Sequence, residues 1–261
     1  MARSFLFAQD DTAVATTRLI ATAASSTGFM KGAPGAPAEG WYRIGGDNAG
    51  FVAALHEALR QTYPQAGAAF HAVRLWTNLI WQPAYLAVIS VHLHGAVPDF
   101  SGLSQDRRGI YVDGFRLAGR PQRSGTIAEM IADAAGQLRA ATDAMLAEVN
   151  ALERLRDTPA RRLLAYRMAA LMLWLGHRRP EMSNDDVLAT ATQWFEATDL
   201  TSHVALQAVP AGDGSSVLIV RRKGCCLDYL ITPERLCASC PKQPEAVRLQ
   251  RQTENALAEW G

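Results

Sequence analysis

Apolar residues recur at helical spacing through most of the first 200 residues. In the stretch that begins near Asp47, Phe51, Leu55 and Leu59 fall on one face of a helix. The same period predicts further helices over residues 11–25, 66–80, 126–156, 160–176 and 184–197. The N-terminal part of the chain is therefore predicted to be mainly helical.

The segment after residue 80 has a less regular pattern. Pro83 has no N–H group for a helical hydrogen bond, so we expect it to break or kink the preceding helix. The apolar stretch 85–95 fits either a buried helix or a strand, and we favour a helix for its first half. We assign its two histidines, His92 and His94, a structural role, because no further metal ligand lies near them in the sequence.

Loops and a small sheet are predicted where the helical period stops. Residues 28–46 contain six glycines and two prolines and should form a loop, with Trp41 and Tyr42 anchoring it to the domain. The polar residues 99–108 are predicted to form a second loop. The residues that follow alternate in polarity around Asp113–Gly114, a hairpin turn signal, so we expect a small antiparallel pair there.

The sequence pattern changes near residue 200. Strands are predicted at His203–Val209 and Val217–Arg222, with a turn at 211–216 between them, and a closing helix from about Pro244 to Trp260. The expected fold class is α+β and mainly helical. Residues 1–200 would form a larger helical domain with a small antiparallel sheet, and residues 201–261 a small C-terminal, cysteine-rich domain made of a β-hairpin and a helix.

Composition and charge exclude several classes of function. Hydrophobic residues make up 49% of the chain and charged residues 20%, as in ordinary soluble globular proteins. The net charge of +1 lacks the basic excess of nucleic-acid-binding proteins, so we expect no nucleic-acid partner. The N-terminal apolar run of residues 5–8 is too short for a secretory signal, and no run is long enough to span a membrane. We expect a cytoplasmic protein; peripheral association with the inner face of the cytoplasmic membrane stays open.

All four cysteines lie in one window, CCLDYLITPERLCASC, which begins at Cys225. Thiolates favour soft metal centres, and in the cytoplasm such a group is more often metal-binding than disulfide-bonded. Cys237 and Cys240 form a C-x2-C pair, which presents both sulfurs on one side of a turn. Cys225 and Cys226 would point to opposite faces of a regular strand, so we expect Gly224 to let the chain twist there.

The ten residues between the cysteine pairs are long enough for a strand followed by a turn back to the start. The chain is therefore able to close a site of four thiolates. Its spacing, C-C-x10-C-x2-C, matches neither a pair of zinc knuckles nor the common iron–sulfur patterns. On spacing alone, zinc and an iron–sulfur cluster are equally open.

The segment VLIVRRKGCCLDYLITPERLCASCP resembles the signature of the FhuF-like siderophore-iron reductases. The similar features are a strand that ends in basic residues, the double cysteine, and the C-x2-C pair followed by proline. The total length and the position of the motif near the C-terminus also fit. In the helical part, the arrangement of Trp76, Trp81 and Pro83 is similar to the larger domain of that family.

This resemblance implies that Cys225, Cys226, Cys237 and Cys240 bind one [2Fe–2S] cluster in the C-terminal domain. It implies an oxidoreductase that reduces ferric iron in hydroxamate siderophores by one electron and releases Fe(II) in the cytoplasm. Residues 1–200 would then bind the siderophore. A separate donor, such as a ferredoxin or a flavin reductase, would supply the electron, because no flavin- or nicotinamide-binding pattern is visible. The alternatives are a non-catalytic protein with a structural four-cysteine zinc site, and an iron–sulfur electron carrier or sensor without siderophore activity.

Basic residues directly precede the first cysteine. We expect Arg221, Arg222 and Lys223 to bind the substrate, to offset the negative charge of the cluster or to attract an acidic electron donor. The alternative is that they are only solvated. Side chains alternate along a strand, so at most one of the two arginines would face the substrate. Four tryptophans in helical patterns are expected to pack in the core or to line a siderophore cleft: Trp76, Trp81, Trp174 and Trp194.

Overall fold

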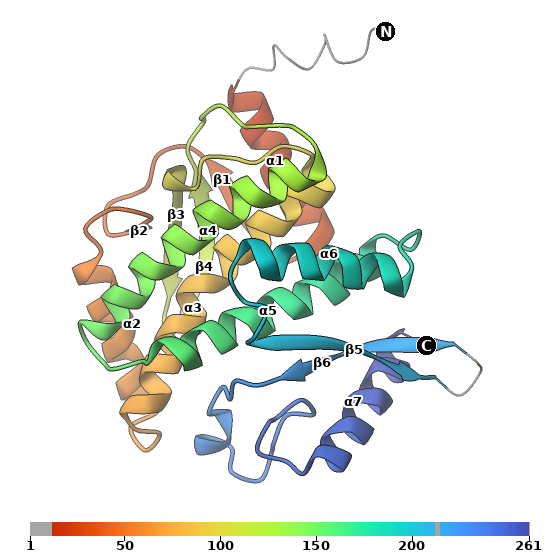
Figure 1. Cartoon of the computed structure of the whole chain (residues 1–261). Helices are drawn as coiled ribbons and strands as arrows, with labels where there is room; N and C mark the ends of the chain where they lie inside the picture. Colours follow the sequence, from red (N-terminus) through yellow and green to blue (C-terminus); the bar gives the residue numbers. More distant parts are fainter. Residues whose placement is uncertain (1–11, 212–214, 261) are drawn as a thin grey trace, which may run out of the picture. The chain divides into compact units, whose positions relative to one another are not determined.

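Seven α-helices dominate the part of the chain that the computed structural model describes, residues 12–211 and 215–260 (Figure 1). The fold class is α+β and mainly helical, as predicted. The helices are α1 Thr12–Thr27, α2 Ala49–Thr62, α3 Ala68–Ile89, α4 Ile127–Asn150, α5 Asp157–Arg178, α6 Asn184–Ala197 and α7 Glu245–Trp260. The N-terminal apolar run at residues 5–8 and the middle of the turn expected at 211–216 lie outside the described residues.

The starts of α5 and α6 follow their sequence signals. Pro159 lies in the first turn of α5, where a missing N–H group costs nothing. Ser183 caps α6 and forms a capping box with Asp186, each side chain accepting from the other residue's backbone N–H group. These two boundaries were predicted and are confirmed.

Pro83 does not break its helix, so the predicted break is wrong, whereas the alternative of a kink stays a prediction. Helix α3 runs through Pro83 to Ile89 and continues as a π-helical turn, Ser90–His94. Proline leaves the carbonyl oxygen four residues earlier, that of Leu79, without its helical donor. The buried side chain of Gln105 supplies one, its Nε2 lying 3.0 Å from the Leu79 oxygen. A residue distant in sequence thus keeps the helix continuous.

The larger sheet is mixed, whereas a purely antiparallel one was expected. Its order is β1-β4-β3-β2, with β1 parallel to β4 and the other pairs antiparallel. The strands are β1 Gly32–Pro34, β2 Tyr42–Arg43, β3 Leu103–Arg108 and β4 Tyr111–Leu117. The segment 28–46, predicted as loop, therefore contributes both edge strands.

The predicted loop at 99–108 and the predicted hairpin turn are also wrong. Residues 103–108 form β3, in which the polar side chains of Ser104 and Gln105 are buried and Gln105 donates to Leu79 and Gln82 instead of facing solvent. The chain turns at Gly109, which has a positive φ of 62°, and Asp113–Gly114 lies inside β4. Helix α3 binds this strand through side-chain donors: Asn78 to the oxygen of Ile110, Trp81 to that of Val112 and Gln82 to that of Gly114.

Contacts divide the chain into two compact units, and the division falls inside α2, α3 and α4. One unit is built from the residues up to Ala58 together with Asn78–Glu148, and the other from Leu59–Thr77 together with the chain from Val149 onward. The expected domain boundary at residue 200 lies inside the second unit. The assignment of siderophore binding to residues 1–200 and of the cluster to residues 201–261 stays a prediction.

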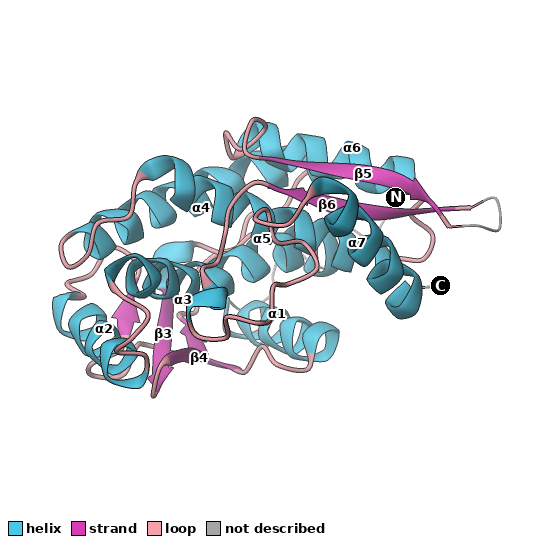
Figure 2. Ribbon diagram, turned by 90° about the horizontal axis from the view of Figure 1, so that it is seen from below, coloured by secondary structure: helices cyan, strands magenta, loops and turns pink. Residues whose placement is uncertain are grey.

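The second unit contains the predicted C-terminal hairpin. Strands β5 Val204–Pro210 and β6 Ser216–Arg222 pair in antiparallel register, and both α5 and α7 pack on them (Figure 2). Trp76 and Trp194 are buried, as predicted, and the indole nitrogen of Trp76 donates to the oxygen of Ala160. None of the helices in the described part of the chain combines the length and hydropathy needed to span a bilayer.

Candidate metal centre

The four cysteines gather within 4.5 Å, close to the C-terminal end of the chain. Cys225 and Cys226 follow the end of β6 and are half-buried, whereas Cys237 is exposed and Cys240 is only 2% exposed. None of them forms a disulfide. In the described residues no group of three or more His, Cys, Asp or Glu side chains already has the arrangement that holds a single metal ion. The four thiols therefore lie close together, consistent with a possible metal or cluster site, but they are not arranged around the position of a single ion.

We expected the backbone freedom of Gly224 to let the chain twist at the double cysteine, and this prediction is wrong. The φ of Gly224 is not positive. A Cβ atom at this position would lie 3.0 Å from the Cβ of Arg162 and 3.3 Å from the nitrogen of Leu163, so Gly224 serves a close approach to α5. The left-handed residue is Leu227, with φ 62°, and its N–H group donates to the sulfur of Cys225 at 3.4 Å. The chain therefore reverses one residue after the cysteine pair.

No strand follows the double cysteine, in contrast to the prediction. Asp228–Leu230 is a 3-10 turn, and the oxygen of Asp228 accepts from both Ile231 and Thr232. These local bonds satisfy backbone groups of the segment in place of a partner strand. Turns, not a hairpin, bring the second cysteine pair back to the first.

The C-x2-C pair is a tight turn held by residues of α7 and the loop before it. The N–H group of Cys240 donates to the oxygen of Cys237 at 2.9 Å, and so does the side-chain amide of Gln243 at 2.8 Å. Arg251 holds Gln243 in place and also donates to the oxygen of Leu236 at 3.0 Å. The sequence analysis did not identify Gln243 and Arg251. Only the helical period of α7 could have indicated that Arg251 faces the cysteines.

Arg222 is the cation that reaches the cysteines. It is only 6% exposed, its guanidinium lies 4.1 Å from the ring centre of Tyr166, and its Nη1 lies 3.7 Å from the sulfur of Cys237. Its Nε donates to the oxygen of Gly224. Among the described residues, no carboxylate forms an ion pair with it. Burying a charge is costly unless it is compensated, and the sulfurs of Cys226 and Cys237 and the carboxylate of Asp228 interact electrostatically with this guanidinium.

The other two basic residues contact different groups. Arg221 points to the opposite face of β6, where it donates to Gln207 at 3.0 Å and pairs with Glu245. Lys223 donates to the oxygen of Ser202 at 2.8 Å. Only one of the two arginines thus faces the cysteines. A substrate-binding role for Arg221, Arg222 and Lys223 stays a prediction.

The thiols are also linked to one another. The pKa of Cys226 lies below its ordinary value, because the thiols of Cys225 and Cys237 donate hydrogen bonds to it. The pKa values of Cys225 and Cys237 are raised for the same reason, with burial adding to the effect. Burial raises the pKa of Asp228, and its ion pair with Arg74, at 3.1 Å, opposes this. Cys225, Cys226 and Cys237 thus form one hydrogen-bonded group of sulfurs, in which deprotonation is favoured at Cys226.

A cavity of about 480 Å³ opens beside the sulfurs. All four cysteines line it, together with the cationic Arg235 and Arg251 and with Tyr229, whose ring lies 4.3 Å from the ammonium of Lys242. The two arginines beside the sulfurs favour a negatively charged centre, whereas Asp228, which also lines the cavity, opposes it. The histidines of the first unit are not part of it: the Nε2 of His94 lies 2.7 Å from the side-chain oxygen of Gln122.

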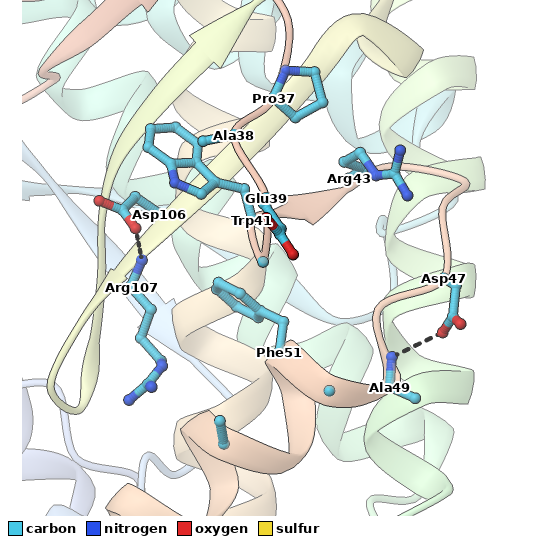
Figure 3. Close-up of a pocket in the computed structure, with 13 residues that line it drawn as sticks. Pro37, Ala38, Glu39, Trp41, Arg43, Asp47, Ala49, Phe51, Asp106 and Arg107 are labelled. Carbon is cyan, nitrogen blue, oxygen red and sulfur yellow. Dashed lines mark hydrogen bonds between the residues drawn. The ribbon is translucent and has the colours of Figure 1, made fainter.

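The first unit has a cavity of its own, of about 710 Å³, which sequence reasoning did not identify (Figure 3). Trp41 and Phe51 line it, and Tyr42 beside them is buried, as the predicted anchoring role requires. Carboxylates and guanidinium groups both surround the cavity: Glu39, Asp47 and Asp106 with Arg43 and Arg107. This mixture of charges indicates no single ligand class.

No protein-family model matches the chain, and no solved structure matches it significantly. A function for the protein therefore has to be argued from its own residues.

Proposed function

We propose that the protein is a cytoplasmic siderophore-iron reductase whose four cysteines hold a [2Fe–2S] cluster. The observation that carries the proposal is that the four cysteines of the C-C and C-x2-C pairs lie close together. One of them, Cys237, is exposed. The resemblance of this segment to the FhuF-like reductases supports the choice of cluster and of reaction.

The donors around the sulfurs fit such a cluster. A [2Fe–2S] centre takes four thiolate ligands, and hydrogen bonds to its sulfurs adjust its potential. The backbone of Leu227 donates to Cys225, and the guanidinium of Arg222 donates to Cys237. When bound, the cluster would supply a one-electron redox couple.

The residues of the chain would place that couple within reach of a bulky, water-soluble substrate. Cys237 is exposed, so the electron path from this ligand to a ferric complex outside the protein is short. Gln243 and Arg251 hold the turn that carries Cys237. Hydroxamate oxygens are hard ligands that hold Fe(III) more tightly than Fe(II), so one electron makes the iron releasable. A separate donor, such as a ferredoxin or a flavin reductase, is part of this proposal.

The content of the purified protein tests the cluster. We expect a red-brown protein with matched amounts of iron and acid-labile sulfide, and loss of both in Cys226→Ser. A colourless protein with one zinc per chain would favour the structural zinc site instead. A normal cluster spectrum in Cys226→Ser would mean that the adjacent cysteines do not both bind.

Iron release tests the reaction. Chemically reduced protein is mixed with a ferric trihydroxamate and an Fe(II) chelator, and Fe(II) should form faster than with the reductant alone. Zinc-loaded protein is the matched control, because it keeps four bound thiolates without a redox couple. Equal rates for the cluster-loaded and zinc-loaded forms would contradict the reductase and leave an electron carrier or sensor.

A further inference from the structure

A further cavity of the first unit, of about 900 Å³, lies beside α1. One face of this helix forms its long wall, with lining residues at helical spacing between Thr12 and Ser25. The other walls are the end of the π-helical turn at His94 and the loop that contains Gln122. All of these residues belong to the first unit and the four cysteines to the second, so the cavity is not part of the candidate metal centre.

The charge at this cavity is positive. Arg18 of α1 lines it, and none of its lining residues in the described part of the chain is acidic. Burial lowers the pKa of His94 below its ordinary value, and the charge of Arg18 lowers it further, whereas the hydrogen bond to Gln122 opposes both. An anion in the cavity would therefore gain a counter-charge from Arg18 and would favour a proton on His94.

Gln122 has a hydrogen-bond donor without an acceptor. Its Oε1 lies 2.7 Å from the Nε2 of His94, whereas its own Nε2 is buried and has no hydrogen-bond partner among the described residues. A buried donor that stays unpaired is costly, and an oxygen of a ligand in the cavity would remove this cost. The terminal torsion of glutamine has a broad energy minimum, so the amide can turn toward such an oxygen.

An uncommon backbone conformation places His94 at the wall of the cavity. π-helical turns are rare and occur frequently at functional sites. The turn Ser90–His94 ends at Gly95, whose positive φ of 84° favours glycine, and the N–H groups of Gly95 and Ala96 both donate to the oxygen of Ser90. The backbone therefore fixes the position of His94, and Gln122 fixes the orientation of its ring.

Hydroxyl groups along α1 indicate the chemistry of the rest of the ligand. The hydroxyl of Thr22 donates to the backbone oxygen of Arg18 at 2.9 Å, and that of Ser25 donates to the backbone oxygen of Thr22 at 3.1 Å. A hydroxyl that donates its only proton keeps lone pairs that accept hydrogen bonds. Both side chains line the cavity, so they suit a ligand that carries hydroxyl donors of its own.

We infer that this cavity binds the phosphate group of a hydroxyl-rich metabolite, such as a sugar phosphate, through Arg18, His94 and Gln122. A phosphate dianion carries enough charge to compensate Arg18 and to favour a proton on His94, whereas a carboxylate carries a single charge. The hydroxyls of the sugar would donate to Thr22 and Ser25. The inference is independent of the proposed function, because it uses no residue of the cysteine site.

Titration calorimetry of the full chain with glucose 6-phosphate tests the site. We expect binding by the unmodified protein, and about tenfold weaker binding by Arg18→Gln and by Gln122→Leu, because each loses a hydrogen bond to an ionised group. Arg107→Gln is the matched control. It removes the same charge from a residue that lines the other cavity of the first unit, and its affinity should equal that of the unmodified protein.

Two further ligands separate the parts of the inferred ligand. Gluconate has a carboxylate in place of the phosphate, and inorganic phosphate has no sugar hydroxyls. Each should bind about tenfold more weakly than glucose 6-phosphate, since each lacks one set of hydrogen bonds. Equal affinity of gluconate would overturn the choice of phosphate, and equal affinity of inorganic phosphate would overturn the contribution of the sugar hydroxyls.

Two other results would overturn the site as a whole. One is no binding of glucose 6-phosphate by the unmodified protein. The other is an equal loss in Arg18→Gln and Arg107→Gln, which would show that only the overall charge attracts the ligand. Circular dichroism checks that each variant folds. If Gln122→Leu does not fold, Arg18→Gln decides, because Arg18 is exposed and its replacement removes no packing of the core.

Discussion

At the scale of single residues, Arg221 and Arg222 show how a shift of one position along a strand changes the groups that a side chain contacts. Both are adjacent in sequence and carry the same charge. Arg222 is buried against Tyr166 and donates to Cys237, whereas Arg221 lies on the other face with Gln207 and Glu245. The alternation of side chains along β6 predicted that the two would differ. Which of them faces the cysteines followed only from the packing of α5 on the hairpin.

Replacing Arg222 tests its electrostatic role. A buried cation beside the sulfurs favours the reduced, more negative state of a cluster, so Arg222→Gln should lower the reduction potential by about 60 mV, a tenfold change in a one-electron equilibrium. Redox titration followed by visible absorption measures the shift. Arg221→Gln is the matched control on the same strand and should leave the potential nearly unchanged. Equal shifts in both variants would show that only the overall charge matters.

At the scale of elements, α3 shows a local sequence rule overridden by a distant side chain. Pro83 was expected to break or kink this helix, because it removes a hydrogen bond. The helix continues because Gln105 of β3 donates to the oxygen of Leu79. The same glutamine explains why a polar segment that looks like a loop forms a strand, since Gln105 is fully buried. Two errors of the sequence analysis thus have one physical cause.

The contact between Gln105 and Leu79 is testable by substitution and rescue. Gln105→Leu leaves the Leu79 oxygen buried without a donor, and we expect a loss of about 1–3 kcal/mol in the free energy of unfolding. Urea unfolding followed by circular dichroism measures this loss. Adding Pro83→Ala restores a backbone N–H group for the same oxygen, so the double variant should recover part of the stability. Additive losses in the double variant would contradict this account of the helix.

At the scale of the whole molecule, the cysteine segment differs from the elements around it. Between the end of β6 and the start of α7 the chain forms turns and one 3-10 turn, without a strand or an α-helix. Its order depends on hydrogen bonds to α7 residues and on the four sulfurs. Metal bonds commonly supply folding free energy in such segments.

Removing the metal or cluster of the proposed site should therefore loosen this segment alone. After chelation under reducing conditions, we expect amide hydrogen exchange in residues 225–240 to speed up at least tenfold, while α5 and α6 keep their protection. Exchange followed by mass spectrometry measures both regions in one experiment. Reloading with zinc should restore the protection, since it joins the same thiolates. A uniform change across α5, α6 and the cysteine segment would show that the metal supports the whole unit.

The periodic features of the chain were predictable from its sequence alone. Helical spacing located the helices, the capping box at Ser183 and Pro159 located two helix starts, and strand patterns located the C-terminal hairpin. The clustering of four cysteines in one window indicated a thiolate site. These features depend on neighbours within a few residues, because helical faces, caps and tight turns are formed locally.

Only the tertiary structure decided the features that join distant residues. It gave Pro83 a substitute donor in Gln105, gave Gly224 its close approach to Arg162, and placed Arg222 at Cys237. It also formed a groove of about 380 Å³ beside Cys237, whose walls come from α5, β6 and α7. The sequence by itself predicted that its four cysteines are able to form one site. The packing of helices on the hairpin determined which charges and which surface surround them, because neither is set by residues that are neighbours in the chain.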